Sequence, residues 1–185
     1  GCCGALHAHN GHLDEARSLA MALVNSMPKD LPIIVDSAGC GSTMKEYGTL
    51  MGDANFASRV FDISEFLVAE GLADVLAMSN GVSATVTYHD ACHLAHGQRI
   101  TQQPRMLISA IPNASYVPLP ESDLCCGSAG IYNVLQPEMA RNLLDRKFAN
   151  VVATGASIVA TGNPGCHAWI AQAAREQGGT VHVLH

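Results

Sequence analysis

The stretch "LCCGSAG", residues 124–130, places two adjacent cysteines, Cys125 and Cys126, directly before a run of small residues. Adjacent cysteines rarely form a disulfide with each other, because disulfide geometry is demanding and the ring that would close is strained. Small residues let another group approach the backbone closely. The stretch therefore predicts reduced thiols beside a group that needs room, which is typical of metal-binding or redox chemistry.

A similar stretch begins at Cys2, so that the chain contains one pattern twice. The first copy reads "CCGALHAHNGHLDEARSLAMALVNSM" and then "PIIVDSAGC"; the second reads "CCGSAGIYNVLQPEMARNLLDRKFANVV" and then "ASIVATGNPGC". Each copy combines a CCG triplet, a helical pattern, a short apolar run and a final Gly-Cys pair. We expect two pseudo-symmetric halves, residues 1–84 and 85–185.

The second copy also has a leading cysteine, whose counterpart in the first copy would precede Gly1. We therefore expect the chain to be the C-terminal part of a longer protein. The second copy therefore has a complete set of four thiols, Cys92, Cys125, Cys126 and Cys166. The first copy supplies an incomplete set, Cys2, Cys3 and Cys40.

The spacing of apolar residues predicts helices that alternate with short buried strands. One helix is expected between a cap at Asn10 and a stop at Pro28, and another between Pro137 in its first turn and a stop at Gly155. Two more are expected at about 97–111 and 62–71. Strands are expected at 33–35, 86–88, 116–119, 158–161 and 181–184. This order predicts an α/β fold with mainly parallel sheet strands and flanking helices.

Three of the cysteines follow predicted strands, in "IIVDSAGC", "VTYHDAC" and "IVATGNPGC". In an open α/β sheet, ligands bind beyond the carboxyl ends of the strands. We therefore expect the loops of the second half to bring its four thiols together. Four thiolates are what a [4Fe–4S] cluster or a structural zinc ion needs.

The composition narrows the classes of function. The chain of 185 residues carries a net charge of −6, which argues against a nucleic-acid partner. No apolar run reaches the roughly 18 residues that span a bilayer, and the start of the chain does not resemble a signal peptide. The seven cysteines are odd in number, which disfavours a disulfide framework. We expect a cytoplasmic protein with reduced thiols.

The spacing of the thiols favours an iron–sulfur cluster over zinc. Structural zinc sites usually pair their ligands as C-x₂₋₄-C, and this chain has no such pair. Adjacent cysteines suit a multi-iron cluster, because the two thiols can reach different irons. A zinc-stabilised interaction domain without a redox role remains an alternative.

The chain resembles a known protein family over nearly its whole length. Five segments carry the resemblance: "CCGALHAHNG", "DSAGCGSTMKEYG", "YHDACHLAHGQRI", "LCCGSAGIYNVLQPEMA" and "NPGC". They are similar to the cysteine-rich CCG domain of heterodisulfide reductase subunits B and D, of lactate-utilisation iron–sulfur proteins and of the iron–sulfur subunit of glycolate oxidase. The likeness to the last of these is the strongest.

The resemblance implies an electron-transfer subunit of an oxidoreductase, a flavin-dependent glycolate oxidase or dehydrogenase. A [4Fe–4S] cluster on Cys92, Cys125, Cys126 and Cys166 would relay electrons from FAD in a partner subunit towards the respiratory chain. This chain would then have no catalytic residue of its own, and would meet the membrane only peripherally, through the complex. Cys2, Cys3 and Cys40 would need an upstream fourth ligand to hold metal.

One departure from the family pattern bears on the type of cluster. Heterodisulfide reductase closes each motif with C-x-x-C, whereas here Cys166 and Cys40 lack that second cysteine. We therefore expect an ordinary four-thiolate cluster. A thiol/disulfide redox subunit of the heterodisulfide reductase or lactate-utilisation kind is the alternative.

Histidines flank the leading cysteine in "HDACHLAHG". His89, His93 or His96 could contact the cluster, but we expect them to cap the turn and the following helix. Asp90 is likewise expected to cap the turn.

Overall fold

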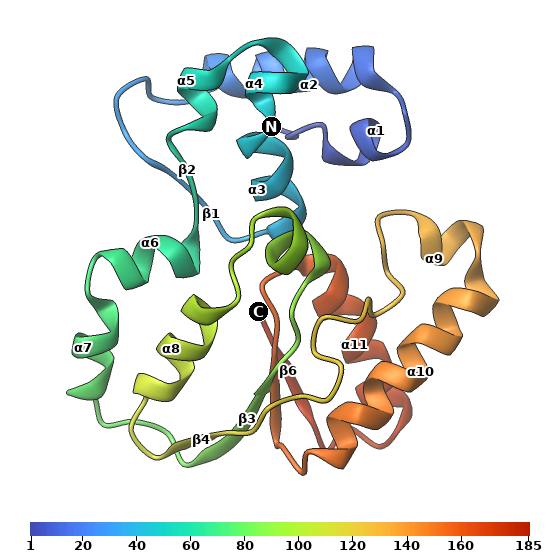
Figure 1. Ribbon diagram of the computed structural model, residues 1–185. Coiled ribbons are helices and arrows are strands. Elements are labelled where there is room, and N and C mark those ends of the chain that lie inside the picture. Colours follow the sequence, from blue (N-terminus) through green and yellow to red (C-terminus); the bar gives the residue numbers. More distant parts are fainter. The chain divides into compact units, whose positions relative to one another are not determined.

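The computed structural model describes residues 1–185, which form two compact units, Gly1–Ile63 and Ser64–His185 (Figure 1). Each unit has a sheet of its own, and all strand pairs in both sheets are parallel. The predicted α/β fold with parallel strands and flanking helices is confirmed. The boundary between the two units lies about twenty residues before residues 84/85. The division at 84/85 was drawn from the sequence repeat, and it stays a prediction.

The first unit contains a two-stranded sheet and short helices. Its elements are α1 (Ala5–His9), α2 (Leu13–Ser26), β1 (Ile33–Val35), α3 (Ala38–Lys45), α4 (Tyr47–Met51), α5 (Ala54–Ala57) and β2 (Val60–Asp62). Strand β1 pairs with β2 so that Ile33 lies opposite Val60. The rings of Tyr47 and Phe56 stack in the core with their centroids 5.3 Å apart.

The second unit is a four-stranded sheet covered by helices. Its elements are α6 (Ile63–Ala69), α7 (Leu72–Ala77), β3 (Ala84–Tyr88), the π-helix η1 (His93–Gly97), α8 (Gln102–Ala110), β4 (Ala114–Tyr116), α9 (Tyr132–Leu135), α10 (Pro137–Ala153), β5 (Ile158–Ala160), α11 (Pro164–Glu176) and β6 (His182–Leu184). The strand order is β4-β3-β5-β6. Helix α8 lies on one side of this sheet, and α10 and α11 lie on the other (Figure 1).

This strand order creates a switch point in the middle of the sheet. From β3 the chain crosses through α8 to β4, and from β5 it crosses through α11 in the opposite direction to β6. The neighbouring strands β3 and β5 therefore send their carboxyl-end loops to opposite faces. A crevice between two such loops is where open α/β sheets bind ligands. Here the two loops lead to Cys92 and to Cys166.

The two long predicted helices are confirmed. Helix α2 ends at Ser26, just before Pro28, and α10 begins at Pro137 and ends shortly before Gly155. Gly155 adopts a φ of 66°, the left-handed conformation that commonly follows a helix. None of the helices combines the length and the apolar character that a bilayer crossing requires.

Some boundaries differ from the predictions. Asn10 does not cap α2; it ends the separate short helix α1, and α2 begins two residues beyond Gly11, whose φ of 83° reverses the chain. The helix expected at about 97–111 begins only at Gln102, because η1 ends at Gly97 and Arg99, with a φ of 60°, breaks the helical conformation between them. Strand β4 ends at Tyr116, shortly before Pro118, which has no N–H for a sheet ladder.

Candidate metal centre

The glycine of each CCG triplet lets the turn pack directly against the backbone of a following helix. Gly127 has a φ of +95°, and a Cβ atom there would lie 2.3 Å from the carbonyl oxygen of Ala140. Gly4 has a φ of +80°, and its Cβ would lie 2.7 Å from the carbonyl oxygen of Ala16. Both contacts are far too short for any other residue, and both alanines are completely buried. The two copies therefore share one turn as well as one sequence pattern.

The same turn directs a backbone amide at the first cysteine of each pair. The amide of Gly127 donates to the Cys125 sulfur at 3.3 Å, and the amide of Gly4 donates to the Cys2 sulfur at 3.5 Å. Such hydrogen bonds favour the thiolate form, which is the form that binds metal.

The Gly-Cys pair of each copy opens a helix that follows a parallel strand. Cys166 is the third residue of α11, after β5, and Cys40 is the third residue of α3, after β1. The first turn of a helix carries partial positive charge, which also favours a thiolate. The sequence thus places this cysteine at the carboxyl end of a strand and at the start of a helix.

The structure brings together the four cysteines of the second unit. Hydrogen bonds link the thiol of Cys92 to that of Cys125, Cys125 to Cys126, and Cys126 to Cys166. Cys126 and Cys166 are buried, with 0 % and 5 % of their surface exposed. Residues far apart in the chain therefore converge at the switch point, while the binding of metal by them stays a prediction.

The protons on these thiols are unevenly shared. Hydrogen bonds donated by Cys126 and Cys92 lower the pKa of Cys125. The bond donated by Cys126 also lowers the pKa of Cys166, and His89 and Asn163 act in the same direction. The two donors, Cys92 and Cys126, have raised pKa values because donating to a neighbour favours their protonated form and burial adds to the effect. A thiophilic metal binding here would displace those protons.

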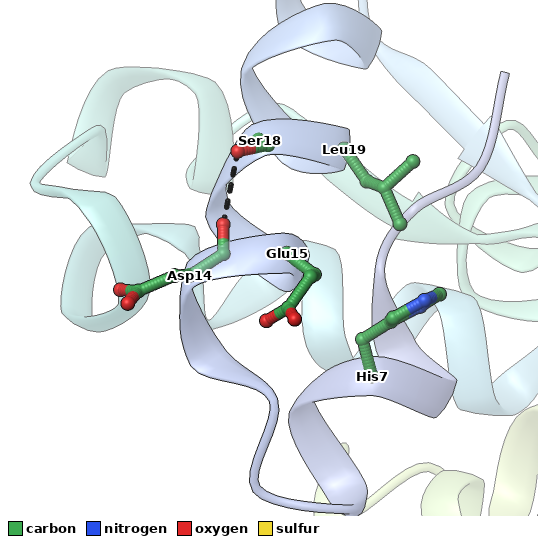
Figure 2. Close-up of a pocket in the computed structure, with 5 residues that line it drawn as sticks. All are labelled: His7, Asp14, Glu15, Ser18 and Leu19. Carbon is green, nitrogen blue, oxygen red and sulfur yellow. Dashed lines mark hydrogen bonds between the residues drawn. The ribbon is translucent and has the colours of Figure 1, made fainter.

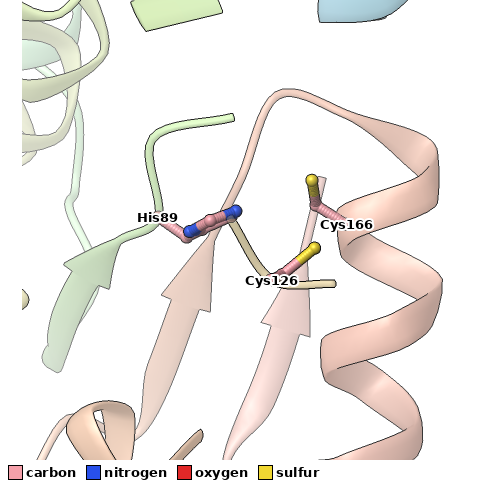
Figure 3. A group of neighbouring side chains, drawn as sticks. All are labelled: His89, Cys126 and Cys166. Carbon is pink, nitrogen blue, oxygen red and sulfur yellow. The ribbon is translucent and has the colours of Figure 1, made fainter. Parts of the chain in front are cut away.

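His89 reaches this group from the end of β3. Its imidazole is completely buried, and neither ring nitrogen makes a hydrogen bond of normal geometry. Its donor atom and the sulfurs of Cys126 and Cys166 all lie within 4.8 Å of one another. Figure 3 shows the ring pointing towards the two sulfurs. The expectation that His89 caps the turn is therefore wrong.

The other two histidines of the loop lie elsewhere. The Nδ1 atom of His93 is 3.5 Å from the sulfur of Cys92. His96 is exposed, and its Nε2 atom is 4.0 Å from a carboxylate oxygen of Asp123. Neither side chain belongs to the buried group around Cys126.

Asp90 forms an ion pair rather than a turn cap. Its two carboxylate oxygens accept hydrogen bonds from the guanidinium of Arg105 at 2.8 and 2.5 Å, and only 4 % of its side chain is exposed. Burial alone would raise the pKa of the Asp90 carboxyl, but the hydrogen bonds from Arg105 and Ser122 lower it. Sequence reasoning missed Arg105, since an arginine on an amphipathic helix is usually solvated.

Lys147 supports the same region from α10. The side chain is fully buried, and its ammonium group donates to the carbonyl oxygen of Glu121 and, at 3.3 Å, to that of Ser122. The amide of Asp90 donates to the same Ser122 carbonyl at 3.1 Å. The buried Lys147 and the half-buried Arg105 thus hold the segment that leads into the CCG turn.

The first unit holds an incomplete version of the site. The thiols of Cys3 and Cys40 are hydrogen-bonded to each other, and Cys2 beside them is exposed. The hydroxyl of Tyr47 donates to the carbonyl oxygen of Cys3 at 2.7 Å and fixes the turn. Residues Gly1–Ile63 contain these three cysteines and no fourth.

A pocket of about 540 Å³ also lies in the first unit, but no cysteine lines it. Figure 2 shows its lining residues, His7, Asp14, Glu15, Ser18 and Leu19, around the start of α2. The hydroxyl of Ser18 donates to the backbone carbonyl of Asp14 at 3.0 Å. Because most of these side chains are exposed, the pocket is an open surface feature separate from the thiols.

The residues of the second unit fit a thiolate-bound metal group. Four sulfurs converge, the side-chain amide of Asn163 lies 3.5 Å from the Cys166 sulfur, and the orphaned His89 nitrogens point to a missing polar partner. Four converging thiolates suit either an iron–sulfur cluster or a single zinc ion.

Comparison with known proteins bears on that choice. A family model described as a cysteine-rich domain matches residues 1–45 and 86–171, which include all seven cysteines. The chain is 35 % identical over 198 residues to the probable glycolate oxidase iron-sulfur subunit of Bacillus subtilis (strain 168), with 100 % of the chain and 44 % of the relative covered.

Two further relatives carry related names. The glycolate oxidase iron-sulfur subunit of Escherichia coli (strain K12) is 30 % identical over 187 residues, with 95 % of the chain and 45 % of the relative covered. Lactate utilization protein A of Oceanobacillus iheyensis is 27 % identical over 190 residues, with 100 % and 78 % covered. The chain spans less than half the length of the two glycolate oxidase subunits.

Proposed function

The chain belongs to the family of cysteine-rich CCG domains, and on that basis we propose that it is part of the iron–sulfur subunit of a glycolate-oxidising complex. Its second unit would hold one [4Fe–4S] cluster through Cys92, Cys125, Cys126 and Cys166. The observation that carries the proposal is the convergence of these four sulfurs at the switch point of a parallel sheet. The names of the two glycolate oxidase relatives support the choice of cluster and of complex.

The contribution of this chain's own residues follows from the geometry. The four thiolates would bind the cluster, which when bound accepts and releases one electron at a time. The amide of Gly127 and the side chain of Asn163 donate hydrogen bonds to two of the sulfurs and stabilise their negative charge. The burial of Cys126 and Cys166 keeps water from that side of the site.

The finer parts of the proposal concern partners. We expect FAD in a partner subunit to deliver electrons to this site, and the respiratory chain to receive them. The complex would lie in the cytoplasm, with any attachment to the membrane made through its other subunits. The net charge of −6 disfavours nucleic acid as a partner.

The test uses the full-length subunit in its complex, purified without oxygen. We expect iron and acid-labile sulfide, together with a paramagnetic signal on reduction. Cys125→Ser should remove the signal of the second unit with its iron. Cys40→Ser, which changes the equivalent thiol set of the first unit, should leave that signal intact. Protein that contains no iron and one tightly bound zinc ion would show that the site is a structural zinc site.

Lactate is the second candidate fuel, because the chain covers 78 % of the lactate-utilisation relative and less than half of the glycolate oxidase subunits. The purified complex should be offered glycolate and lactate with an artificial electron acceptor. Faster oxidation of glycolate supports the first choice, and faster oxidation of lactate supports the second. Turnover of a heterodisulfide would instead indicate a thiol/disulfide redox subunit.

A further inference from the structure

His89 is the one side chain of the site whose polar atoms have no partner to explain their burial. The imidazole is 0 % exposed, and neither Nδ1 nor Nε2 makes a hydrogen bond of normal geometry. A buried polar group without a partner costs free energy, so native proteins rarely leave one in that state. The polar atoms beside the ring are the sulfurs of Cys126 and Cys166, within 4.8 Å (Figure 3).

The backbone fixes the ring in this place. The amide of His89 donates to the carbonyl oxygen of Ala160 on β5 at 2.9 Å, which continues the pairing of the two central strands. The next residue, Asp90, is held by Arg105 through two hydrogen bonds. The imidazole is therefore held on the sulfur side of the loop by contacts on both sides of its Cα atom.

Two roles towards a bound cluster are chemically open to such a ring: iron ligand or hydrogen-bond donor. A histidine that binds metal almost always donates its other N–H to a second-shell acceptor, and the structure offers none here. If one ring nitrogen bound iron, the N–H of the other would be buried without an acceptor. If the ring N–H instead donates to sulfur, only the other nitrogen, an acceptor, stays without a partner, and buried acceptors without a partner are less rare than buried N–H groups. Four cysteines also already supply a ligand for each iron of a [4Fe–4S] cluster.

We propose that His89 donates a hydrogen bond from a ring N–H to the thiolate of Cys126 or Cys166 and thereby raises the reduction potential of the cluster. This inference rests on the proposed function, because it needs the cluster. Reduction adds negative charge that spreads onto the ligating sulfurs, and a donor aimed at sulfur stabilises that charge. His89 would tune the cluster without binding iron.

The test compares three variants in the intact complex. His89→Leu removes the donor but keeps apolar volume, and His89→Gln keeps an N–H donor. As a matched control, His96→Leu removes an exposed histidine of the following π-helix η1. Iron and sulfide content, the midpoint potential from a redox titration followed by paramagnetic resonance, and the Fe–S(Cys) stretching frequencies are measured at one pH. Pulsed resonance of the wild type measures the nitrogen coupling.

We expect His89→Leu to keep the iron of the wild type, to have a more negative midpoint potential and to shift the Fe–S(Cys) bands. His89→Gln should recover part of the wild-type potential, and His96→Leu should match the wild type. The weak nitrogen coupling of a hydrogen-bonded imidazole should disappear in His89→Leu.

Three results would overturn the inference. An unchanged potential and unchanged Fe–S(Cys) bands in His89→Leu would show that no such hydrogen bond exists. A strong nitrogen coupling in the wild type would show that His89 is an iron ligand. If His89→Leu fails to fold or to hold iron, the His89→Gln variant decides. A His89→Gln protein with the midpoint potential of His96→Leu supports the donor role, and a His89→Gln protein without cluster contradicts it. Wild-type protein without iron would instead refute the proposed function itself, and this inference with it.

Discussion

At the scale of single residues, Gly127 is the position with the tightest steric constraint near the thiols. A side chain there meets the backbone of Ala140, which cannot move without shifting α10, and the φ of +95° is strained for any residue but glycine. Gly155 has a similar φ of +66° but open space around it. The pair therefore separates the cost of the backbone conformation from the cost of the close approach.

We predict that Gly127→Ala destabilises the chain by about 3 kcal/mol, as the sum of left-handed strain and a steric clash. Gly155→Ala should cost about 1 kcal/mol, because it bears the strain alone. Urea unfolding of both variants in the metal-free state measures the two free energies. Equal losses in the two variants would show that the CCG turn does not depend on contact with the helix.

At the scale of elements, the segment before the CCG turn is held by side chains from two helices. Arg105 of α8 pairs with Asp90, and Lys147 of α10 binds the carbonyl oxygens of Glu121 and Ser122. These contacts join the loop after β3 to the segment that leads into Cys125. The positions of two predicted ligands, Cys92 and Cys125, therefore depend on charged groups that do not touch them.

Removing the cation of the buried ion pair should be costly. We predict that Arg105→Met destabilises the chain by about 3 kcal/mol, because the Asp90 carboxylate remains buried without its partner. The double variant with Asp90→Asn should lose less than Arg105→Met alone. Arg141→Met, which breaks two exposed pairs, with Asp145 and Glu176, should cause a much smaller change in the same unfolding experiment. Equal effects of the two arginine variants would contradict the role of Arg105.

Lys147 offers a second test at this scale. We predict that Lys147→Met, which keeps the length of the side chain, costs about 2 kcal/mol, because the Glu121 carbonyl loses the ammonium donor and the Ser122 carbonyl keeps only the Asp90 amide. Amide exchange around residues 121–124 should become faster. Lys29→Met, on an exposed lysine, serves as the control and should leave both readouts unchanged. Unchanged stability in Lys147→Met would mean that solvent or another donor replaces the ammonium group.

At the scale of the whole molecule, the repeat and the parallel sheets can be predicted from patterns in the sequence. The CCG triplets, the Gly-Cys pairs and the buried stripe of α10 each predict an element or a turn that the structure contains. The same patterns predict that Cys92, Cys125 and Cys166 converge, because each lies at a strand end or before a helix.

The supporting contacts could not be predicted in the same way. Arg105 and Lys147 act through partners fifteen or more residues away, and a cation in an amphipathic helix is solvated in most proteins. His89 was grouped with two neighbouring histidines, since only the pairing of β3 with β5 turns it towards the sulfurs. Strand β2 is not predicted, because only its first two residues are apolar and its last, Asp62, falls in the helical pattern expected at 62–71.

The central claim is that one iron–sulfur cluster lies between the four cysteines of the second unit. Anomalous diffraction from crystals of the intact subunit, grown without oxygen and measured on both sides of the iron absorption edge, tests it most directly. We predict a compact iron peak bounded by the sulfurs of Cys92, Cys125, Cys126 and Cys166. A lone zinc peak bound by His89, Cys126 and Cys166, or no metal peak at these residues, would contradict the account.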